Sequence, residues 1–358
     1  MIRVAYWGEG ASFGGVETHL IEILSNLDRR SFEPTLFCRP VKELVAAAQE
    51  LDVPVHALPP LRGKLDLGYH AGVVRALRRD QSELLHVVQG DSYTSLTALG
   101  AAKRLGKRGV VVTVQRPSST SERLYELVRR LATSQVDLQI APSAYVIELL
   151  TSMSQRRPRL ELVRNGIGAI QPVTREHARA QLGLRGDRPA VGAALRLVGW
   201  KRAEVIVEAA RELPDVDFVV LGDGPERERL ERLAQGTSVR FLGFQAQAGS
   251  LLGAFDVFVH PTPTEPQGIA VLEAMAAGVP VVVADSGGAA ESVEHERTGL
   301  LALAEGPAFA AAIRRLLDQP ELARRLSAVA AEEIRTRFSS AAMTRQLERL
   351  YNDVLGVS

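Results

Sequence analysis

The sequence predicts an α/β protein with two doubly wound domains in tandem, each built on a parallel sheet. Short apolar runs alternate with longer segments that have the periodicity of helices, as expected for parallel strands joined by helical crossovers. The same alternation starts again after a stretch rich in glycine, proline and charge at residues 168–188. The chain has 358 residues, 46% of them apolar, which is enough for two hydrophobic cores.

The first predicted domain covers residues 1–168 and the second covers residues 169–340. In the first domain we expect helices at 16–27, 44–51 and 72–79, and strands at 2–7, 33–38, 53–58, 84–88, 109–114, 138–143 and 160–165. In the second domain we expect helices at 202–211, 226–234 and 268–277, and strands at 190–195, 216–222, 239–243, 257–261, 280–285 and 299–303.

Residues 341–358 form an amphipathic segment, which we expect to return to the first domain as a helix. Two doubly wound domains in tandem would leave a cleft between them, at the carboxyl ends of both sheets.

Composition excludes several classes of protein. The net charge of +1 gives no overall field for nucleic-acid binding. Cys38 is the single cysteine, so an intramolecular disulfide and a cysteine-rich metal site are excluded. We expect Cys38 to lie in a strand of the core. A single cysteine also agrees with the expected cytoplasmic location. The seven histidines show no zinc-binding spacing. Without a signal peptide or a run of about 18 apolar residues, any membrane contact would be peripheral.

One helical segment allows two interpretations. Leu124, Leu127, Val128 and Leu131 form an apolar stripe beside three arginines, and residues 1–167 carry five more basic than acidic side chains. We expect the stripe to pack against the sheet. The alternative is contact with an anionic membrane surface, to which the basic segment 103–108 would add charge.

The glycines near the start of the chain resemble the outline of a dinucleotide-binding turn. Gly8, Gly10 and Gly14 have a loose form of that spacing. The second strand, however, is followed by Arg39, where an NAD site would have an acid. We therefore favour a helix that starts at Gly14–Gly15 and faces a diphosphate, with Gly8 and Gly10 letting the loop bend; NAD(P) binding is the alternative.

The sharpest signal is the stretch from residue 261 to 293. Glu265 lies in a proline-rich loop, Gly268 opens an apolar helix, and Glu273 lies within that helix. Carboxylates placed in this way can bind the hydroxyl groups of a ribose and of a second sugar, and the free N–H groups at Gly268 can bind hydroxyls or an anion. Two solvated acids are the alternative.

These motifs occur with several others in a fixed order. "FGGVETHLIEIL", "VRNGIG", "LRLVGWKR", "LGDGPERERLERLA" and "FLGF" precede the two glutamates and "EAMAAGVPVV". Together they resemble the retaining nucleotide-sugar-dependent glycosyltransferases of family 4 (group 1). The resemblance implies the GT-B architecture, with two Rossmann-like domains and a cleft between them. It also implies transfer of a sugar from a nucleoside-diphosphate sugar to an acceptor hydroxyl with retention of configuration and without a protein nucleophile.

The resemblance also implies roles for individual residues. Arg196 and Lys201 would stabilise the leaving diphosphate, and Glu265 would meet the sugar ring, so that these three are the catalytic candidates. Glu273 would bind the ribose. The other donor-binding candidates are Gly15, Gly222, Leu242, Gly243, Gln267, Gly268 and Ile269.

Some positions depart from the family pattern. Gln115 stands where many relatives have a histidine, and Arg202 stands where a glycine is common. Gly14, Gln115 and His260 are candidates for the cleft or the acceptor site, whereas we expect His86 to be a core residue. We interpret the Asp-x-Asp at 215–217 as an exposed turn, so that neither a metal ion nor a cofactor is expected.

The acceptor stays open between a saccharide, a lipid and a natural product. We expect a cytoplasmic enzyme, with contact to the inner face of the membrane as an option, and no nucleic-acid partner. Two alternative functions are a GT-B nucleotide-sugar epimerase and a non-catalytic subunit that binds a sugar nucleotide.

Overall fold

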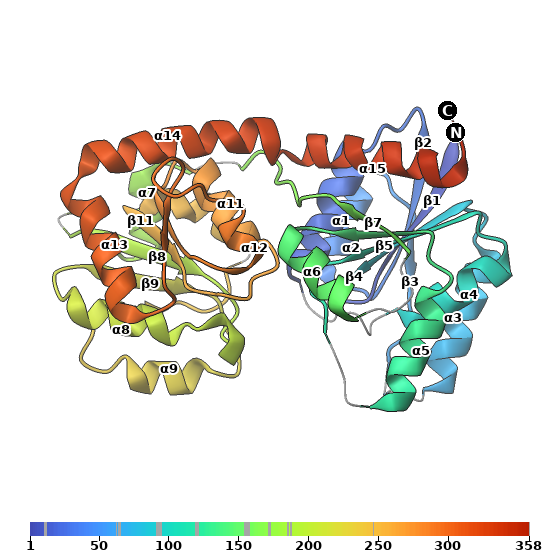
Figure 1. The fold of residues 1–358 in the computed structure, drawn as a ribbon, viewed down its shortest axis with the longest axis horizontal. Helices are drawn as coiled ribbons and strands as arrows, with labels where there is room; N and C mark the ends of the chain where they lie inside the picture. Colours follow the sequence, from blue (N-terminus) through green and yellow to red (C-terminus); the bar gives the residue numbers. More distant parts are fainter. Residues whose placement is uncertain are drawn as a thin grey trace. The chain divides into compact units, whose positions relative to one another are not determined.

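A computed structural model gives the fold of the chain. It describes residues 1–10, 13–61, 63, 66–90, 95–118, 122–153, 158–170, 173–184, 186, 188–245 and 247–357. The chain divides into two compact units (Figure 1). Unit 1 contains residues 1–166 and 340–358, and unit 2 contains residues 167–339.

Unit 1 is built on a seven-stranded sheet with the order β3-β2-β1-β4-β5-β6-β7, and all neighbouring strands are parallel. The strands are β1 (Ile2–Gly8), β2 (Phe32–Cys38), β3 (Val55–Ala57), β4 (Leu84–Gln89), β5 (Gly109–Val114), β6 (Leu138–Ala141) and β7 (Arg159–Leu162). The helices are α1 (Gly15–Asn26), α2 (Lys42–Glu50), α3 (Leu67–Arg79), α4 (Leu96–Ala102), the 3-10 turn η1 (Lys103–Leu105), α5 (Arg123–Thr133), α6 (Ala144–Met153) and α15 (Ser340–Leu355).

Unit 2 repeats this topology with six parallel strands in the order β10-β9-β8-β11-β12-β13. The strands are β8 (Ala190–Ala194), β9 (Asp217–Leu221), β10 (Val239–Phe241), β11 (Val257–His260), β12 (Val281–Ala284) and β13 (Leu300–Ala302). The helices are α7 (Arg175–Gln181), α8 (Glu204–Glu212), α9 (Arg227–Leu233), α10 (Ala248–Leu251), α11 (Ile269–Ala276), α12 (Gly287–Ala290), α13 (Gly306–Asp318) and α14 (Pro320–Arg337), with 3-10 turns η2 (Gly199–Lys201) and η3 (Leu252–Ala254).

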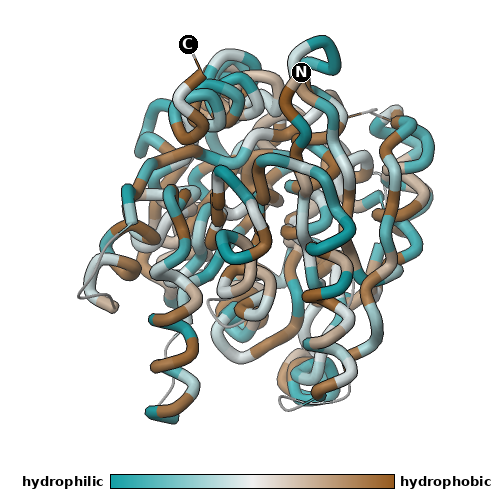
Figure 2. The backbone as a smooth tube through the Cα atoms, turned by 90° about the vertical axis from the view of Figure 1, so that its right-hand side faces the viewer, coloured by the Kyte–Doolittle hydropathy of each residue, from teal (hydrophilic) through white to brown (hydrophobic). Residues whose placement is uncertain are grey.

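Each sheet separates two layers of core. Side chains alternate along a strand, so Val4 and Tyr6 of β1 pack with α1, α2 and α15, whereas Ala5 and Trp7 pack with α3, α4 and α6. Both faces of a central strand are therefore apolar, which is why these strands appear in the sequence as continuous hydrophobic runs. Hydrophobic and hydrophilic residues alternate along the helices (Figure 2). This alternation is typical of amphipathic helices that pack one face against a sheet.

The strand order reverses beside the first strand of each unit. In unit 1 the reversal lies between β1 and β4, and in unit 2 it lies between β8 and β11. Crossover connections leave on opposite sides at such a point, so that a crevice opens beyond the carboxyl ends of the two strands. The end of β11, at His260, is therefore where unit 2 is expected to bind a ligand.

The predicted fold class is confirmed, and every predicted strand is present. The predicted helix at 72–79 begins earlier, at Leu67, because the Asp66 side chain accepts a hydrogen bond from the N–H of Tyr69 and caps the helix. Cys38 is buried, and burial raises the pKa of its thiol to about 11. His86 is a core residue as expected, bonded to the Tyr351 hydroxyl at 2.6 Å and to Thr113 Oγ1 at 2.8 Å.

The expectation that the apolar stripe of α5 packs against the sheet is wrong. The buried side chains of α5 are Arg129 and Ala132, and the stripe faces solvent. The exposed fractions are 73% for Leu124, 51% for Leu127, 41% for Val128 and 62% for Leu131. Helical periodicity showed that one face is apolar but not what covers it.

None of the helices in the described ranges combines the length and the apolar character needed to cross a bilayer. The basic segment that follows α4 is mostly engaged within unit 1. Lys107 is buried in an ion pair with Asp80, and Lys103 and Arg108 pair with Asp137 and Glu83.

Candidate functional site

Three polar side chains of unit 2 meet at the carboxyl end of β11. Lys201 Nζ forms an ion pair with Glu265 Oε2, and His260 Nε2 lies 3.0 Å from the same oxygen. The side chains of Lys201 and Glu265 are 13% and 10% exposed, and His260 is 2% exposed. The structure thus brings together two predicted catalytic residues and one predicted cleft residue, at the point of the sheet where ligands bind in this topology.

The positive charge of Lys201 determines the protonation state of the Glu265 carboxyl group. Burial alone would raise the pKa of its carboxyl, but the Lys201 ammonium and the hydrogen bond from His260 lower this pKa to about 2. Glu265 is therefore an anion at neutral pH, and its charge is compensated mainly by Lys201.

The backbone on both sides of the ion pair is also fixed. Lys201 ends the 3-10 turn η2, and its carbonyl accepts a hydrogen bond from Thr262 Oγ1 at 3.0 Å. Its ammonium lies 4.4 Å from the centre of the Trp200 ring, close enough for a cation–π contact. The loop that carries Glu265 and the turn that carries Lys201 therefore hold each other in place independently of the ion pair.

Arg196 is separate from this cluster. It follows β8 and is exposed, and its guanidinium makes no hydrogen bond or ion pair within the described part of the chain. Arg202 has φ +56°, a conformation that favours glycine, and its guanidinium pairs with Glu204 at 2.8 Å. The neighbouring Lys201 is thus the basic residue of this turn that points into the cluster.

A glycine turn that received no role in the sequence analysis holds the Glu265 loop. Gly287 has φ +77°, and a Cβ there would lie 2.6 Å from the carbonyl oxygen of Pro263. The N–H of Gly288 donates to the carbonyl of Glu265 at 2.7 Å. The pair is visible in the sequence as "SGG", but only the packing shows that the absent side chain of Gly287 makes room for the loop.

The helix after the loop places the second glutamate. Gly268 caps α11 with φ +78°, and a Cβ there would crowd Ala289 at 3.1 Å. Ile269 starts α11 and is partly buried, and Gln267 is buried. Glu273 is half-buried within the helix, and a Cβ at Gly249 would lie 3.3 Å from its carboxyl carbon. Glu265 and Glu273 therefore lie in different environments, since Glu265 is almost enclosed and Glu273 is partly open.

Packing within unit 2 explains why glycine stands at the end of β9. Gly222 has φ +135°, and a Cβ there would lie 2.0 Å from the carbonyl oxygen of Leu195. The N–H of Gly222 donates to the carbonyl of Gly243 at 2.8 Å, and the neighbouring Leu242 packs against the core. Gly222 is thus required for the close approach of this turn to the strand end at Leu195.

The predicted site residues of unit 1 lie at two places, the start of α1 and the residue that follows β5. Gln115 and Asn165 exchange two hydrogen bonds, at 2.9 and 3.1 Å. Gly14 and Gly15 form the start of α1, with Gly14 extended at φ −173°. Glu17 in its first turn is buried, and burial raises the pKa of its carboxyl to about 7.

Gly8 and Gly10, which we expected to let the loop bend, are also constrained by packing against α1. Neither has a positive φ. A Cβ at Gly8 would lie 2.6 Å from Leu20, and a Cβ at Gly10 would lie 1.6 Å from the Glu17 carboxylate. The missing side chains leave room for Leu20 and Glu17 of α1 beside the end of β1.

No described residues form a group of three or more histidine, cysteine, aspartate or glutamate side chains suited to a metal ion. Asp215 and Asp217, the acids of the Asp-x-Asp sequence, are engaged instead by arginines. Arg314 forms two hydrogen bonds with Asp215, at 2.6 and 3.0 Å, and Arg188 lies 3.2 Å from Asp217.

Two family models match the chain. "Glycosyltransferase Family 4" matches residues 13–169, and "Glycosyl transferases group 1" matches residues 174–333. A GDP-mannose-dependent alpha-mannosyltransferase of Mycolicibacterium smegmatis is 30% identical over 329 residues, which are 85% of each chain. A lipopolysaccharide core biosynthesis glycosyltransferase, LpsD of Rhizobium meliloti, is 38% identical over 172 residues, 47% of this chain and 50% of LpsD.

Three curated relatives, of which LpsD is one, are matched over only about half of their own length. Among solved structures, the Anabaena protein HepE, in complex with UDP and glucose, has the same fold with a TM-score of 0.84. It is 23% identical, and the match covers 99% of this chain and all of HepE.

The glycine turn can be tested with a matched pair of variants. Gly287→Ala forces an alanine to φ +77° and into the Pro263 carbonyl, whereas Gly278→Ala forces the same conformation, φ +71°, with no atom within 4 Å of the added Cβ. We expect Gly278→Ala to reduce the free energy of unfolding by about 1 kcal/mol and Gly287→Ala by about 3 kcal/mol, because only the latter adds a steric clash. Urea unfolding at neutral pH measures both. Equal losses would show that the turn does not press on the Glu265 loop.

Proposed function

Because the chain belongs to the family 4 (group 1) glycosyltransferases of GT-B architecture, we propose that it transfers a sugar from a nucleoside-diphosphate sugar to an acceptor hydroxyl, with retention of configuration. The observation that carries this proposal is the cluster of Lys201, Glu265 and His260 at the carboxyl end of β11. It places a cation and an anion where a doubly wound unit binds its ligand.

The proposed chemistry follows from charge. When the bond between the sugar and the diphosphate breaks, negative charge develops on the departing phosphate oxygen. Lys201 and the exposed Arg196 neutralise this charge, the first as a mobile ammonium and the second as a planar fork. The acceptor attacks from the side of the leaving group, and its proton passes to the departing phosphate oxygen. This assignment requires neither a metal ion nor a cofactor.

The two glutamates bind hydroxyl groups in this proposal. Glu265 is an anion in a nearly closed environment and accepts hydrogen bonds from the sugar ring. Glu273 is more open and accepts hydrogen bonds from the ribose. The backbone at Gly222, Leu242 and Gly243 lies against the nucleotide base, and Gln267, Gly268 and Ile269 contact the donor at the start of α11. Unit 1 contributes Gly14, Gly15 and Gln115 and binds the acceptor.

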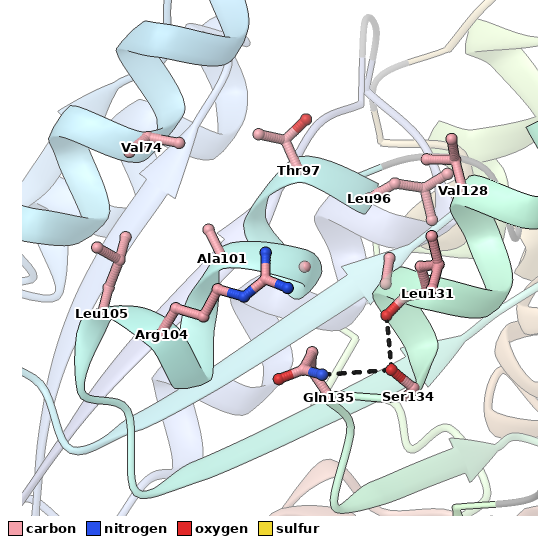
Figure 3. Close-up of a pocket in the computed structure, with 12 residues that line it drawn as sticks. Val74, Leu96, Thr97, Ala101, Arg104, Leu105, Val128, Leu131, Ser134 and Gln135 are labelled. Carbon is pink, nitrogen blue, oxygen red and sulfur yellow. Dashed lines mark hydrogen bonds between the residues drawn. The ribbon is translucent and has the colours of Figure 1, made fainter.

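We place the reaction in the cytoplasm, at the inner face of the membrane. The support is the exposed apolar stripe of α5, defined by Leu124, Leu127, Val128 and Leu131, together with the exposed basic side chains of Arg104 and Arg123. A surface pocket of about 480 Å³ lies between α4 and α5, and Val128, Leu131 and Leu96 lie on one side of it with Arg104 on the other (Figure 3). An apolar helix face with neighbouring cations suits a surface of anionic lipids.

Donor binding and stereochemistry can be tested without knowing the acceptor. We expect saturable binding of UDP or GDP and no binding of NADPH in calorimetric titrations, with slow hydrolysis of one nucleotide sugar from a panel. Lys201→Met should lower the turnover of that hydrolysis at least tenfold, because the leaving diphosphate loses one of its two proposed cations.

Two other results would identify a different function, and a third would contradict the mechanism. Binding without hydrolysis or transfer would indicate a non-catalytic subunit, and conversion of the nucleotide sugar into its epimer would indicate an epimerase. Hydrolysis that first releases the sugar as the anomer of inverted configuration, seen by NMR, would contradict the retaining mechanism.

Membrane contact can be tested by co-sedimentation with vesicles. We expect the protein to bind vesicles that contain phosphatidylglycerol more strongly than vesicles of phosphatidylcholine alone. The double variant Leu127→Glu/Leu131→Glu should lose this binding by a factor of about ten or more, because two apolar side chains no longer enter the lipid surface. Leu303→Glu changes an equally exposed leucine of unit 2 and serves as the control. Binding that persists in the double variant would rule out this surface.

A further inference from the structure

His260 has an unusual position for a polar side chain. It is the last residue of β11, it is 2% exposed, and its Nε2 is 3.0 Å from Glu265 Oε2. For this hydrogen bond the ring carries a proton on Nε2, and its Nδ1 is buried without a hydrogen-bond partner among the described residues. The ring is therefore held in the protein by one polar contact, and that contact is with Glu265.

Glu265 Oε2 has two partners of different mobility. The Lys201 ammonium ends a flexible four-carbon chain that starts from a short 3-10 turn. The His260 ring has two side-chain torsions and starts from a strand that pairs with β12, opposite Val283. Of the two donors, only Lys201 is free to turn toward a ligand without moving the backbone.

Donor binding would therefore change the surroundings of Glu265. In the proposed function, on which this inference rests, the diphosphate attracts the Lys201 ammonium. A buried carboxylate that loses its cation is left with an uncompensated charge and tends to move or to take up a proton. A hydrogen bond from a fixed, enclosed donor opposes both changes because it stabilises the ionised carboxylate in one position.

We propose that His260 is a positioning residue, whose Nε2–H holds the Glu265 carboxylate in place while Lys201 engages the donor diphosphate. His260 does not touch the substrate in this arrangement, since its ring is enclosed. Its effect reaches the reaction through Glu265, which must present its oxygen atoms to the sugar ring at the moment when Lys201 is occupied elsewhere.

The inference is tested with His260→Leu and His260→Gln. Leucine fills a similar volume without a donor, and the glutamine amide can present an N–H near the position of Nε2. The assay is hydrolysis of the nucleotide sugar that the wild type turns over, with calorimetry of UDP and GDP binding alongside. His177→Leu, at an exposed position of α7, is the control.

We expect His260→Leu to lower kcat about tenfold or more, as for the loss of a hydrogen bond to a charged group, and to change KM and nucleotide affinity less than threefold. His260→Gln should restore kcat to within about threefold of the wild type, and His177→Leu should change nothing. If His260→Leu does not fold, His260→Asn replaces it, because its amide is too short to reach Oε2.

Three results would overturn the role of His260. The first is an unchanged kcat in the leucine variant, the second is a glutamine variant as slow as the leucine variant, and the third is a loss confined to KM. A wild type that binds neither UDP nor GDP would instead overturn the proposed function, and the role of His260 with it.

Discussion

The buried ion pair between Lys201 and Glu265 is the interaction on which the site of unit 2 depends. Two charges with side chains only 13% and 10% exposed stabilise a protein only when each compensates the other. The pair also determines the state of Glu265, whose pKa falls to about 2 although burial would raise it. A site that keeps a carboxylate ionised in a nearly closed environment is prepared to bind hydroxyl groups strongly.

The surrounding backbone is arranged to make this pair possible. The loop of Glu265 fits against Gly287, where any side chain would meet the Pro263 carbonyl, and its own carbonyl accepts a hydrogen bond from Gly288. On the other side, Thr262 binds the carbonyl of Lys201. These contacts are all made by uncharged groups, so the charged groups are brought together by a frame that does not itself depend on their attraction.

The fold could be predicted from the sequence because the signal is local. A buried parallel strand is a continuous apolar run, and the alternation of such runs with helices specifies a doubly wound unit. The candidate site could be predicted in part. Glu265 and Glu273 were found from a motif, and His260 stands close to Glu265 in the sequence. The contact of Glu265 with Lys201, 64 residues earlier, arises from the strand order and leaves no mark on the local pattern.

Two other features could not be predicted from the sequence, for a related reason. The stripe of α5 has the periodicity of a core helix, yet its leucines are exposed, because periodicity describes a helix face and not its neighbour. Gly8 and Gly10 appear in the sequence as residues that let a loop bend, and the structure adds that they leave room for Leu20 and Glu17 of α1. In each case the sequence shows the type of residue but not its surroundings. The α5 stripe faces solvent, and the two glycines face side chains of another element, α1.

The most direct test of this account is a double-mutant cycle with Lys201→Met and Glu265→Gln, measured as the free energy of unfolding between pH 7 and pH 3. A lowered carboxyl pKa gives stability that is present above the ordinary value and is lost as the pH falls toward the folded value. We therefore predict a coupling of about 3 kcal/mol at neutral pH that shrinks in acid, because the carboxyl without Lys201 takes up its proton at higher pH. A coupling below about 0.5 kcal/mol, or one that does not change with pH, would contradict the central role of the pair.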